Sequence, residues 1–156
     1  MGKSHAMLLA KQGAKVAVTD INLEECEKVA EEITSQGGEA AAFKMDVTNA
    51  AEIDGVFQAV IKQWGKLDIL VNNAGGPPAG SFEQITDEQW QQAFELNLLS
   101  YIRTIREALP HLKKNGGKII NLASSSIKEP IPGLRLSNTF RTGIVGLTKT
   151  LASELA

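Results

Sequence analysis

Carboxylate, amide and hydroxyl side chains stand directly after four short apolar runs of the sequence. Asp20 and Asp46 follow the first two runs, an Asn-Asn-Ala-Gly segment at 72–75 follows the third, and serines at 124–126 follow the fourth. A carboxylate at the end of a strand can accept hydrogen bonds from the 2′- and 3′-hydroxyls of a ribose and would repel a 2′-phosphate. Asp20 is therefore a candidate for nucleotide binding, the alternative being an ordinary surface aspartate in a turn.

The residue types do not support several other kinds of site. His5 and His111 have no carboxylate or cysteine at metal-binding spacing, so no zinc site is expected. The serines at 124–126 lack the Gly-x-Ser-x-Gly turn and the partnered histidine of a hydrolase. Residues 2–4 match the last positions of a phosphate-binding loop, but the preceding glycine of that motif is missing.

The composition is that of a globular protein of modest charge. The chain has 156 residues, of which 43% are hydrophobic and 22% charged, and its formal net charge is −2. The absence of a Lys/Arg block argues against a nucleic-acid partner, and the absence of an apolar run of about 18 residues argues against a membrane partner. Cys26 is the single cysteine. With no signal peptide in the sequence, we expect a cytoplasmic protein.

Apolar runs and helical patterns alternate along the whole chain. The apolar runs predict strands at residues 15–19, 40–45, 67–71 and 118–123. Helices are predicted to begin at Asn22, at Thr48 or Asn49, at the Thr86–Gln89 capping box and before Ile144. The third helix is long, and Pro110 is expected to kink or shorten its last turn.

This alternation predicts an α/β fold with a doubly wound parallel sheet, because parallel strands are joined by right-handed helical crossovers. Short apolar strands of this kind are expected to be buried on both faces. Ligands of such sheets bind at the carboxyl ends of the strands. All four polar clusters follow a strand at that end, so we expect them to form one site.

Several motifs resemble those of the short-chain dehydrogenase/reductase family, in particular classical bacterial members such as 3-oxoacyl-carrier-protein reductases. The matching segments are Asp46-Val-Thr48, Asn72-Asn-Ala-Gly75, Asn97, the run KIINLAS that ends at Ser124, and GLTKTLASELA at 146–156. Their order and spacing agree across nearly the whole chain. The resemblance implies a Rossmann-like fold and an oxidoreductase that transfers a hydride between a nicotinamide cofactor, NAD or NADP, and an alcohol or ketone.

The resemblance also implies which residues bind the cofactor. They are Gly2, Asp20, Asp46, Val47, Asn73, Ala74, Gly75 and Arg141. Asp20 favours NAD over NADP for the reason given above. Asp46 is expected near the adenine amino group, the alternative being a cap on the following helix. The small residues Ala74 and Gly75 would let the backbone lie against a flat cofactor ring.

The catalytic positions depart from the family's set of Asn, Ser, Tyr and Lys. Asn97 and Ser124 match, and they are expected to hold a proton-relay water and to orient the substrate oxygen. Ser137 and Arg141 occupy the positions of the tyrosine and lysine. A serine hydroxyl is a far weaker acid than a phenol, whose pKa is about 10, and an arginine stays charged, so it can bind ribose but not transfer a proton. Tyr101, the only tyrosine, is expected to be a core residue.

These departures leave the proton donor and the activity open. The alternative donors are Ser124, Ser125, Ser126, Lys128 and a water held by Asn97. The alternatives to an active enzyme are a catalytically silent nucleotide-binding or subunit-interaction protein, and a fragment without independent activity. Besides a small alcohol or ketone, the expected partner is a second copy of the chain. It would bind through the helices at 86–114 and 137–156, which resemble the family's dimer surfaces.

The resemblance further implies that parts of the fold are missing. Family members open with a strand and a glycine-rich turn, of which only the last positions, including Gly2, are present, and the chain ends inside a helix. In the strand order 3-2-1-4-5 the absent first strand is central. Its neighbours, 15–19 and 67–71, would lack backbone partners there, so we expect them either to stay apart or to pair with each other. Residues 1–156 are therefore interpreted as one partial dinucleotide-binding domain.

Overall fold

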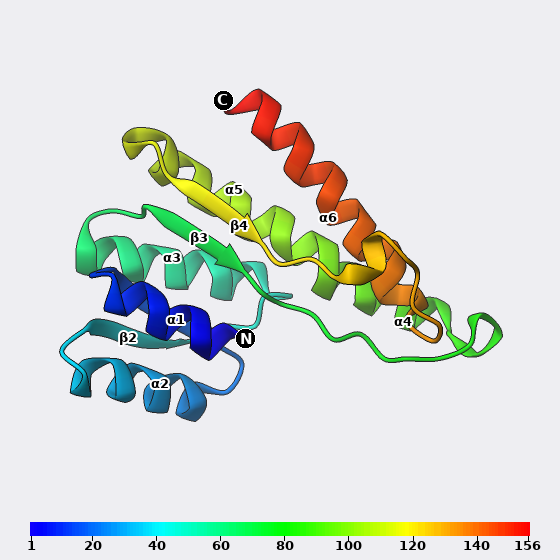
Figure 1. The fold of residues 1–156 in the computed structure, drawn as a ribbon, viewed down its shortest axis with the longest axis horizontal. Helices are drawn as coiled ribbons and strands as arrows, with labels where there is room; N and C mark the ends of the chain where they lie inside the picture. Colours follow the sequence, from blue (N-terminus) through cyan, green and yellow to red (C-terminus); the bar gives the residue numbers. More distant parts are fainter. The chain divides into compact units, whose positions relative to one another are not determined.

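Parallel strands alternate with helices along the chain, as the sequence pattern predicts (Figure 1). The structure is a computed structural model that describes the backbone of residues 1–156 and every side chain except that of Asn115. The chain divides into two compact units, Met1–Lys66 and Leu67–Ala156. The α/β class with parallel strands is confirmed, whereas the assignment of residues 1–156 to one domain stays a prediction.

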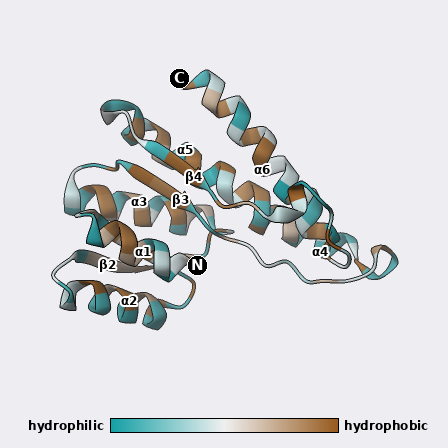
Figure 2. Ribbon diagram, viewed as in Figure 1, coloured by the Kyte–Doolittle hydropathy of each residue, from teal (hydrophilic) through white to brown (hydrophobic). Residues whose placement is uncertain are grey.

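The first unit contains a two-stranded parallel sheet and helices that pack on it. Its elements are α1 (Gly2–Lys11), β1 (Lys15–Asp20), α2 (Leu23–Ser35), β2 (Glu39–Lys44) and α3 (Ala50–Trp64). Asp20 at the end of β1 lies opposite Lys44 at the end of β2. Helices α1 and α2 both pack against β1, and the outer side of α2 is hydrophilic (Figure 2). The carboxyl ends of both strands therefore lie at the same edge of this sheet.

Asparagine caps define where the helices of this unit begin. The Asn22 side chain accepts a hydrogen bond from the backbone N–H of Glu25, as predicted. Asn49, rather than Thr48, caps α3 by accepting from two backbone N–H groups. At the other end of α3, the Trp64 indole donates to Oε1 of Glu39 at 2.7 Å. This bond ties the end of α3 to the start of β2.

The second unit contains another two-stranded parallel sheet. Its elements are β3 (Ile69–Asn72), a 3-10 turn (Phe82–Gln84), α4 (Asp87–Phe94), a π-helical turn (Glu95–Leu99), α5 (Ser100–Asn115), β4 (Lys118–Asn121), a second 3-10 turn (Ser125–Ile127) and α6 (Arg135–Glu154). Strands β3 and β4 run side by side in Figure 1, and Asn72 pairs with Asn121. Helix α5 packs against both strands, and α6 packs against α4 and the π turn.

The long helix of this unit differs from its prediction in two ways. The Thr86–Gln89 capping box begins it as predicted, with both reciprocal hydrogen bonds present. The π turn at Glu95–Leu99, which the sequence pattern does not predict, then interrupts the α-helix. Helix α5 continues through Pro110 to Asn115, so the prediction that Pro110 shortens the last turn is wrong, and the alternative of a kink stays a prediction. Proline removes a single backbone N–H, and the neighbouring turns retain theirs.

The four strands form two separate sheets in residues 1–156, β1 with β2 and β3 with β4. Strands β1 and β3 therefore do not pair with each other, and the alternative in which they do is wrong. Each strand is an edge strand of its sheet, so burial is less complete than predicted: Ile69 of β3 is 37% exposed and Ile120 of β4 is 47% exposed. A strand with a neighbour on one side only has fewer groups to cover it.

Within the described residues, every helix is too short or too polar to span a lipid bilayer.

Candidate functional site

Polar side chains at the ends of β3 and β4 form a hydrogen-bonded row between α5 and α6. Nδ2 of Asn72 donates to Oδ1 of Asn121 at 2.9 Å. The Thr104 hydroxyl on α5 donates to Oδ1 of Asn72 at 2.7 Å, and Nδ2 of Asn121 donates to the Thr148 hydroxyl on α6 at 2.9 Å. Asn72 is buried, and both its amide groups are paired, as a buried amide requires. This polar row, Thr104–Asn72–Asn121–Thr148, holds the ends of the two strands together.

The hydroxyl of Tyr101 lies just beyond the same strand ends. Tyr101 is 1% exposed, so its position in the core is as predicted. Its hydroxyl oxygen lies 3.1 Å from the carbonyl oxygen of Ala74 and 3.0 Å from that of Leu122, and it donates to one or the other. Burial raises the pKa of Tyr101, and the positive charge of Arg141 offsets part of that rise. An interpretation of Tyr101 as core alone misses this polar contact.

Arg141 reaches the same two carbonyl groups from α6. Its Nη1 donates to the Leu122 oxygen at 2.7 Å and to the Tyr101 hydroxyl at 2.8 Å. Its Nη2 donates to the Ala74 oxygen at 2.9 Å. The guanidinium carbon also lies 5.8 Å from the centre of the Tyr101 ring, which allows a cation–π contact. The Arg141–Tyr101 pair thus occupies the backbone oxygens that follow β3 and β4.

Gly75 lies directly against this guanidinium. Its φ of 147° lies in the region that favours glycine. A Cβ at this position would overlap Nη2 of Arg141 and would lie 2.8 Å from its Cζ atom. The sequence predicts a loop without bulk against which a flat cofactor ring can lie. In this structure the flat group against Gly75 is the chain's own guanidinium.

Asn97 lies in the π turn and is fully buried. Its Nδ2 donates to the carbonyl of Ala93 at 2.9 Å, while its Oδ1 has no hydrogen-bond partner among the described residues. A Cβ on Gly75 would lie 3.0 Å from that Oδ1. This oxygen and Nη2 of Arg141 therefore flank the same glycine. Single π turns occur frequently at functional sites, and a buried oxygen without a partner is costly, so Asn97 is well placed to accept a hydrogen bond from a ligand or a water.

The predicted serines differ widely in their surroundings. Oγ of Ser124 accepts a hydrogen bond from the backbone N–H of Ser126 at 3.2 Å and caps the second 3-10 turn. Ser126 is buried, and its hydroxyl has no hydrogen-bond partner among the described residues. Ser126 is therefore too buried to meet a substrate directly. Ser137 is half-buried in the first turns of α6, one turn before Arg141.

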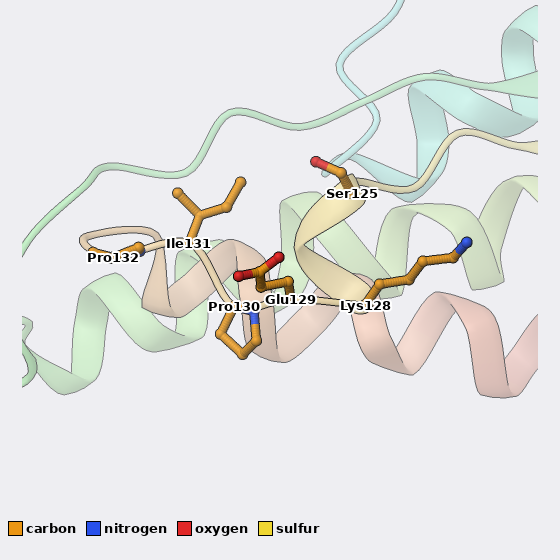
Figure 3. A pocket seen from close by; sticks show the side chains of 6 residues that line it. All are labelled: Ser125, Lys128, Glu129, Pro130, Ile131 and Pro132. Atoms are coloured by element: carbon orange, nitrogen blue, oxygen red, sulfur yellow. The ribbon is translucent and has the colours of Figure 1, made fainter.

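A pocket of about 400 Å³ lies along the loop after β4. It is lined by Ser125, Lys128, Glu129, Pro130, Ile131 and Pro132 (Figure 3). The side chain of Lys128 extends away from the end of the pocket where Ile131 and Pro132 lie. Ser125 and Lys128, two of the alternative proton donors, therefore border a space that could admit a small molecule.

In the first unit, Asp20 is exposed at the end of β1. One of its carboxylate oxygens accepts a hydrogen bond from the backbone N–H of Asn22 at 3.1 Å. The other accepts none from a described residue. Asp20 therefore has an open acceptor at the edge of the sheet where ligands of parallel sheets bind.

Asp46 follows β2 and has a more ordered environment. Its Oδ1 accepts hydrogen bonds from the backbone N–H of Thr48 at 2.8 Å and from the Thr48 hydroxyl at 2.7 Å, and these bonds lower the pKa of the carboxyl group. Since Asn49 caps α3, the interpretation of Asp46 as a helix cap is wrong. Val47 is half-buried beside it, and Gly2 begins α1.

The structure places the predicted residues in its two units. Ala74, Gly75, Asn97 and Arg141 converge in the second unit, whereas Asn73 is exposed in the loop. Gly2, Asp20, Asp46 and Val47 all belong to the first unit. Among the described side chains, no group of three His, Cys, Asp or Glu residues is placed to hold a metal ion.

Sequence reasoning missed the polar row and the contacts of the Tyr101 hydroxyl. Asn72 and Asn121 each stand at the end of a strand-forming run, and that shared position is the signal that points to the row. Tyr101 carries no comparable signal, because its place on an apolar helix face predicts burial and nothing more.

Comparisons with known proteins give one consistent result. A family model described as short chain dehydrogenase matches residues 1–156. The 3-oxoacyl-[acyl-carrier-protein] reductase FabG of Staphylococcus aureus is 35% identical over 100% of this chain and 64% of that protein. The uncharacterized oxidoreductase YxjF of Bacillus subtilis is 35% identical over 99% of this chain and 60% of that protein. The chain thus spans about three fifths of the length of these relatives.

Solved structures agree with the sequence relatives. A 3-ketoacyl-ACP reductase from Sinorhizobium meliloti superposes with a TM-score of 0.95 at 28% identity, over 99% of this chain and 62% of that chain. A hydroxysteroid dehydrogenase from Escherichia coli superposes with a TM-score of 0.90 at 31% identity, over 99% of this chain and 64% of that chain. The fold of this chain is therefore a partial form of the fold of these proteins.

Proposed function

The chain belongs to the short chain dehydrogenase family, and we propose that it is an oxidoreductase that binds a nicotinamide nucleotide and acts on a small alcohol or ketone. One observation carries the proposal beyond membership: Asp20, exposed at the carboxyl end of β1, keeps a carboxylate oxygen open, at the end where ligands of parallel sheets bind. When bound, the nicotinamide supplies or accepts the hydride. The chain's own residues would hold the substrate oxygen and the proton.

The first unit has residues that fit the adenosine end of such a cofactor. Asp20 has a carboxylate oxygen open to a ribose hydroxyl, and its charge would repel a 2′-phosphate. The proposed cofactor is therefore NAD rather than NADP. Asp46 and Val47 are proposed to lie near the adenine ring, and Gly2 near the pyrophosphate.

The second unit fits the nicotinamide end less well. Asn73, Ala74 and Gly75 are proposed as its cofactor loop, but the guanidinium of Arg141 already lies against Gly75. Hydrogen bonds to the protein also engage Arg141, which is the proposed ribose ligand. For Ser124 and Asn97 the proposed roles are to orient the substrate oxygen and to hold a water. No proton-transfer step is assigned, since a serine at 137 is too weak an acid.

That occupied loop favours a second candidate function, a nucleotide-binding or subunit-interaction protein without catalysis. Titration of the chain with NADH, followed by a turnover assay on small ketones, separates the two candidates. Binding with turnover supports the oxidoreductase, and binding without turnover supports the silent protein. Absence of binding contradicts both forms of nucleotide binding.

We also propose that two copies of the chain associate through α5 and α6, which overlap the predicted ranges 86–114 and 137–156. The apolar face of α6 is only partly covered, since Leu147 and Leu151 are half-buried and Leu155 is 39% exposed. Apolar side chains of this kind are commonly covered by a partner. Light scattering after gel filtration tests this, and a monomeric mass at micromolar concentration would contradict it.

A further inference from the structure

We propose that the Arg141–Tyr101 pair closes the carboxyl end of the β3–β4 sheet, so that a nicotinamide nucleotide binds there only by displacing the Arg141 guanidinium. The inference rests on the nucleotide binding proposed above. It adds a specificity determinant: this pair limits whether the chain accepts the nicotinamide half of a dinucleotide.

The hydrogen bonds of the pair support closure. Arg141 donates to the carbonyl oxygens of Ala74 and Leu122, and the Tyr101 hydroxyl lies within 3.1 Å of both. These oxygens lie within two residues of the ends of β3 and β4. A ribose that used them would have to replace charged donors, whose hydrogen bonds are stronger than those of neutral donors.

Steric contact supports the same conclusion. The guanidinium covers the face of Gly75 on which a side chain would project, closely enough that even a Cβ would overlap it. A nicotinamide or ribose ring is much larger than one methyl group. It therefore cannot approach this face of Gly75 while Arg141 keeps its position.

A displaced guanidinium has another acceptor close at hand. Oδ1 of Asn97 is buried, lacks a hydrogen-bond partner among the described residues, and flanks the same glycine as Nη2 of Arg141. A small shift of Nη2 from the Ala74 oxygen toward Asn97 would satisfy that oxygen. A ligand that displaces the guanidinium from the Ala74 oxygen has to supply the difference in free energy between the two arrangements.

Calorimetric titrations of NADH and ADP test the proposal, because ADP lacks both the nicotinamide and the ribose attached to it. The variant is Arg141→Met, which removes the guanidinium and keeps an apolar stem. We expect it to bind NADH about tenfold or more tightly than the natural chain, the scale of one lost hydrogen bond, with ADP affinity unchanged. Arg135→Met is the matched control. Arg135 lies on the same helix and donates to a backbone carbonyl, that of Gly80, at 2.6 Å, and its replacement should change neither affinity.

Each other outcome has a definite meaning. Weaker or unchanged NADH binding by Arg141→Met, with ADP still bound, overturns the closure and leaves nucleotide binding intact. If neither NADH nor ADP binds the natural chain or Arg141→Met, removal of the guanidinium has exposed no nucleotide site. Both this inference and the proposed function then fail.

A measurement on the natural chain covers the case in which Arg141→Met does not fold. Tyr101 is the only tyrosine, so tyrosine labelled with ¹³C at Cζ gives a single resonance that reports on the pair. Saturating NADH should shift this resonance as the guanidinium leaves the hydroxyl, and ADP should not. An unshifted resonance in the NADH complex overturns the proposal.

Discussion

The two units of this chain treat the carboxyl ends of their strands in opposite ways. In the first unit β1 ends at Asp20, which is exposed and keeps a carboxylate oxygen open. In the second unit the backbone oxygens after β3 and β4 accept hydrogen bonds from Arg141 and face the Tyr101 hydroxyl. One strand end thus presents an acceptor to solvent, and the others are closed by the protein's own donors.

This difference shows that family motifs and an open site are separate properties. The loop Asn72–Gly75 and Asn97 match the family's pattern as well as Asp46 does. Whether a ligand can reach them depends on Arg141, a side chain 67 positions away from Ala74 in sequence. A motif specifies which groups are present, and the packing of distant elements decides which of them are free to bind.

The largest effect is expected from restoring the family's tyrosine and lysine at positions 137 and 141. The double substitution Ser137→Tyr with Arg141→Lys supplies a phenol and removes the guanidinium fork from Gly75. Because general acid catalysis contributes about 10²–10⁴-fold, we expect NADH-dependent ketone reduction to rise by a factor in that range, measured as loss of NADH absorbance. The two single variants are controls, and each should gain much less. An unchanged rate in a double variant that binds NADH would show that position 137 is not the acid position.

A substitution at Asn72 tests whether the polar row holds the ends of β3 and β4 together in the second unit. Asn72→Leu leaves Oδ1 of half-buried Asn121 without its donor and takes one acceptor from the buried Thr104 hydroxyl, and a polar group left without a partner inside the protein costs about 1–3 kcal/mol. We expect the second unit to lose about 2–3 kcal/mol in its free energy of unfolding. Urea denaturation followed by Trp90 fluorescence, in a Trp64→Phe background, measures this.

The other end of the polar row provides the control for this substitution. Thr148 is exposed, so Thr148→Val should cost less than about 1 kcal/mol, because water can replace the hydroxyl. Equal losses in the two variants would contradict the view that the buried amide holds the strand ends.

Removing the charge of Asp20 tests whether the exposed carboxylate at the end of β1 binds a nucleotide. Asp20→Asn should weaken NADH binding about tenfold and reduce the preference against NADPH, since the amide neither accepts as strongly nor repels a phosphate. Fluorescence titration with both cofactors measures the effect. Asp54→Asn, a change to an exposed carboxylate on α3 of the same unit, should alter neither affinity. A loss of equal size in both variants would point to general charge rather than to a ribose contact.

The smallest expected effect is a pH dependence in the first unit. Hydrogen bonds from Thr48 lower the pKa of Asp46 in the folded chain, so the carboxylate favours folding above its unfolded pKa of about 3.9. That contribution is lost as the pH falls through the lowered folded pKa. Because the group is half-exposed, solvent keeps the effect small. Acid unfolding followed by Trp64 fluorescence should lose this component in Asp46→Asn, and an unchanged acid limb would contradict it.

The local features of the fold were predictable because they depend on neighbouring residues. The asparagine cap of α2, the capping box of α4 and the four strands follow from side chains within a few positions of each other. The π turn at Glu95–Leu99 was not predictable in this way, because no capping side chain marks where it begins. The exposure of Ile69 and Ile120 likewise depends on how many strands each sheet contains.

The amino-acid sequence alone determined the family, the α/β class and the replacement of the tyrosine and lysine by Ser137 and Arg141, since these are properties of residue identity and order. Only the tertiary structure decided that Tyr101 directs its hydroxyl at two strand ends and that Arg141 lies against Gly75. The hydrogen bonds of Tyr101 and Arg141 join α5 and α6 to the loops after β3 and β4, so they depend on how elements distant in the sequence pack together. The apolar periodicity of a single helix or strand carries no information about that packing.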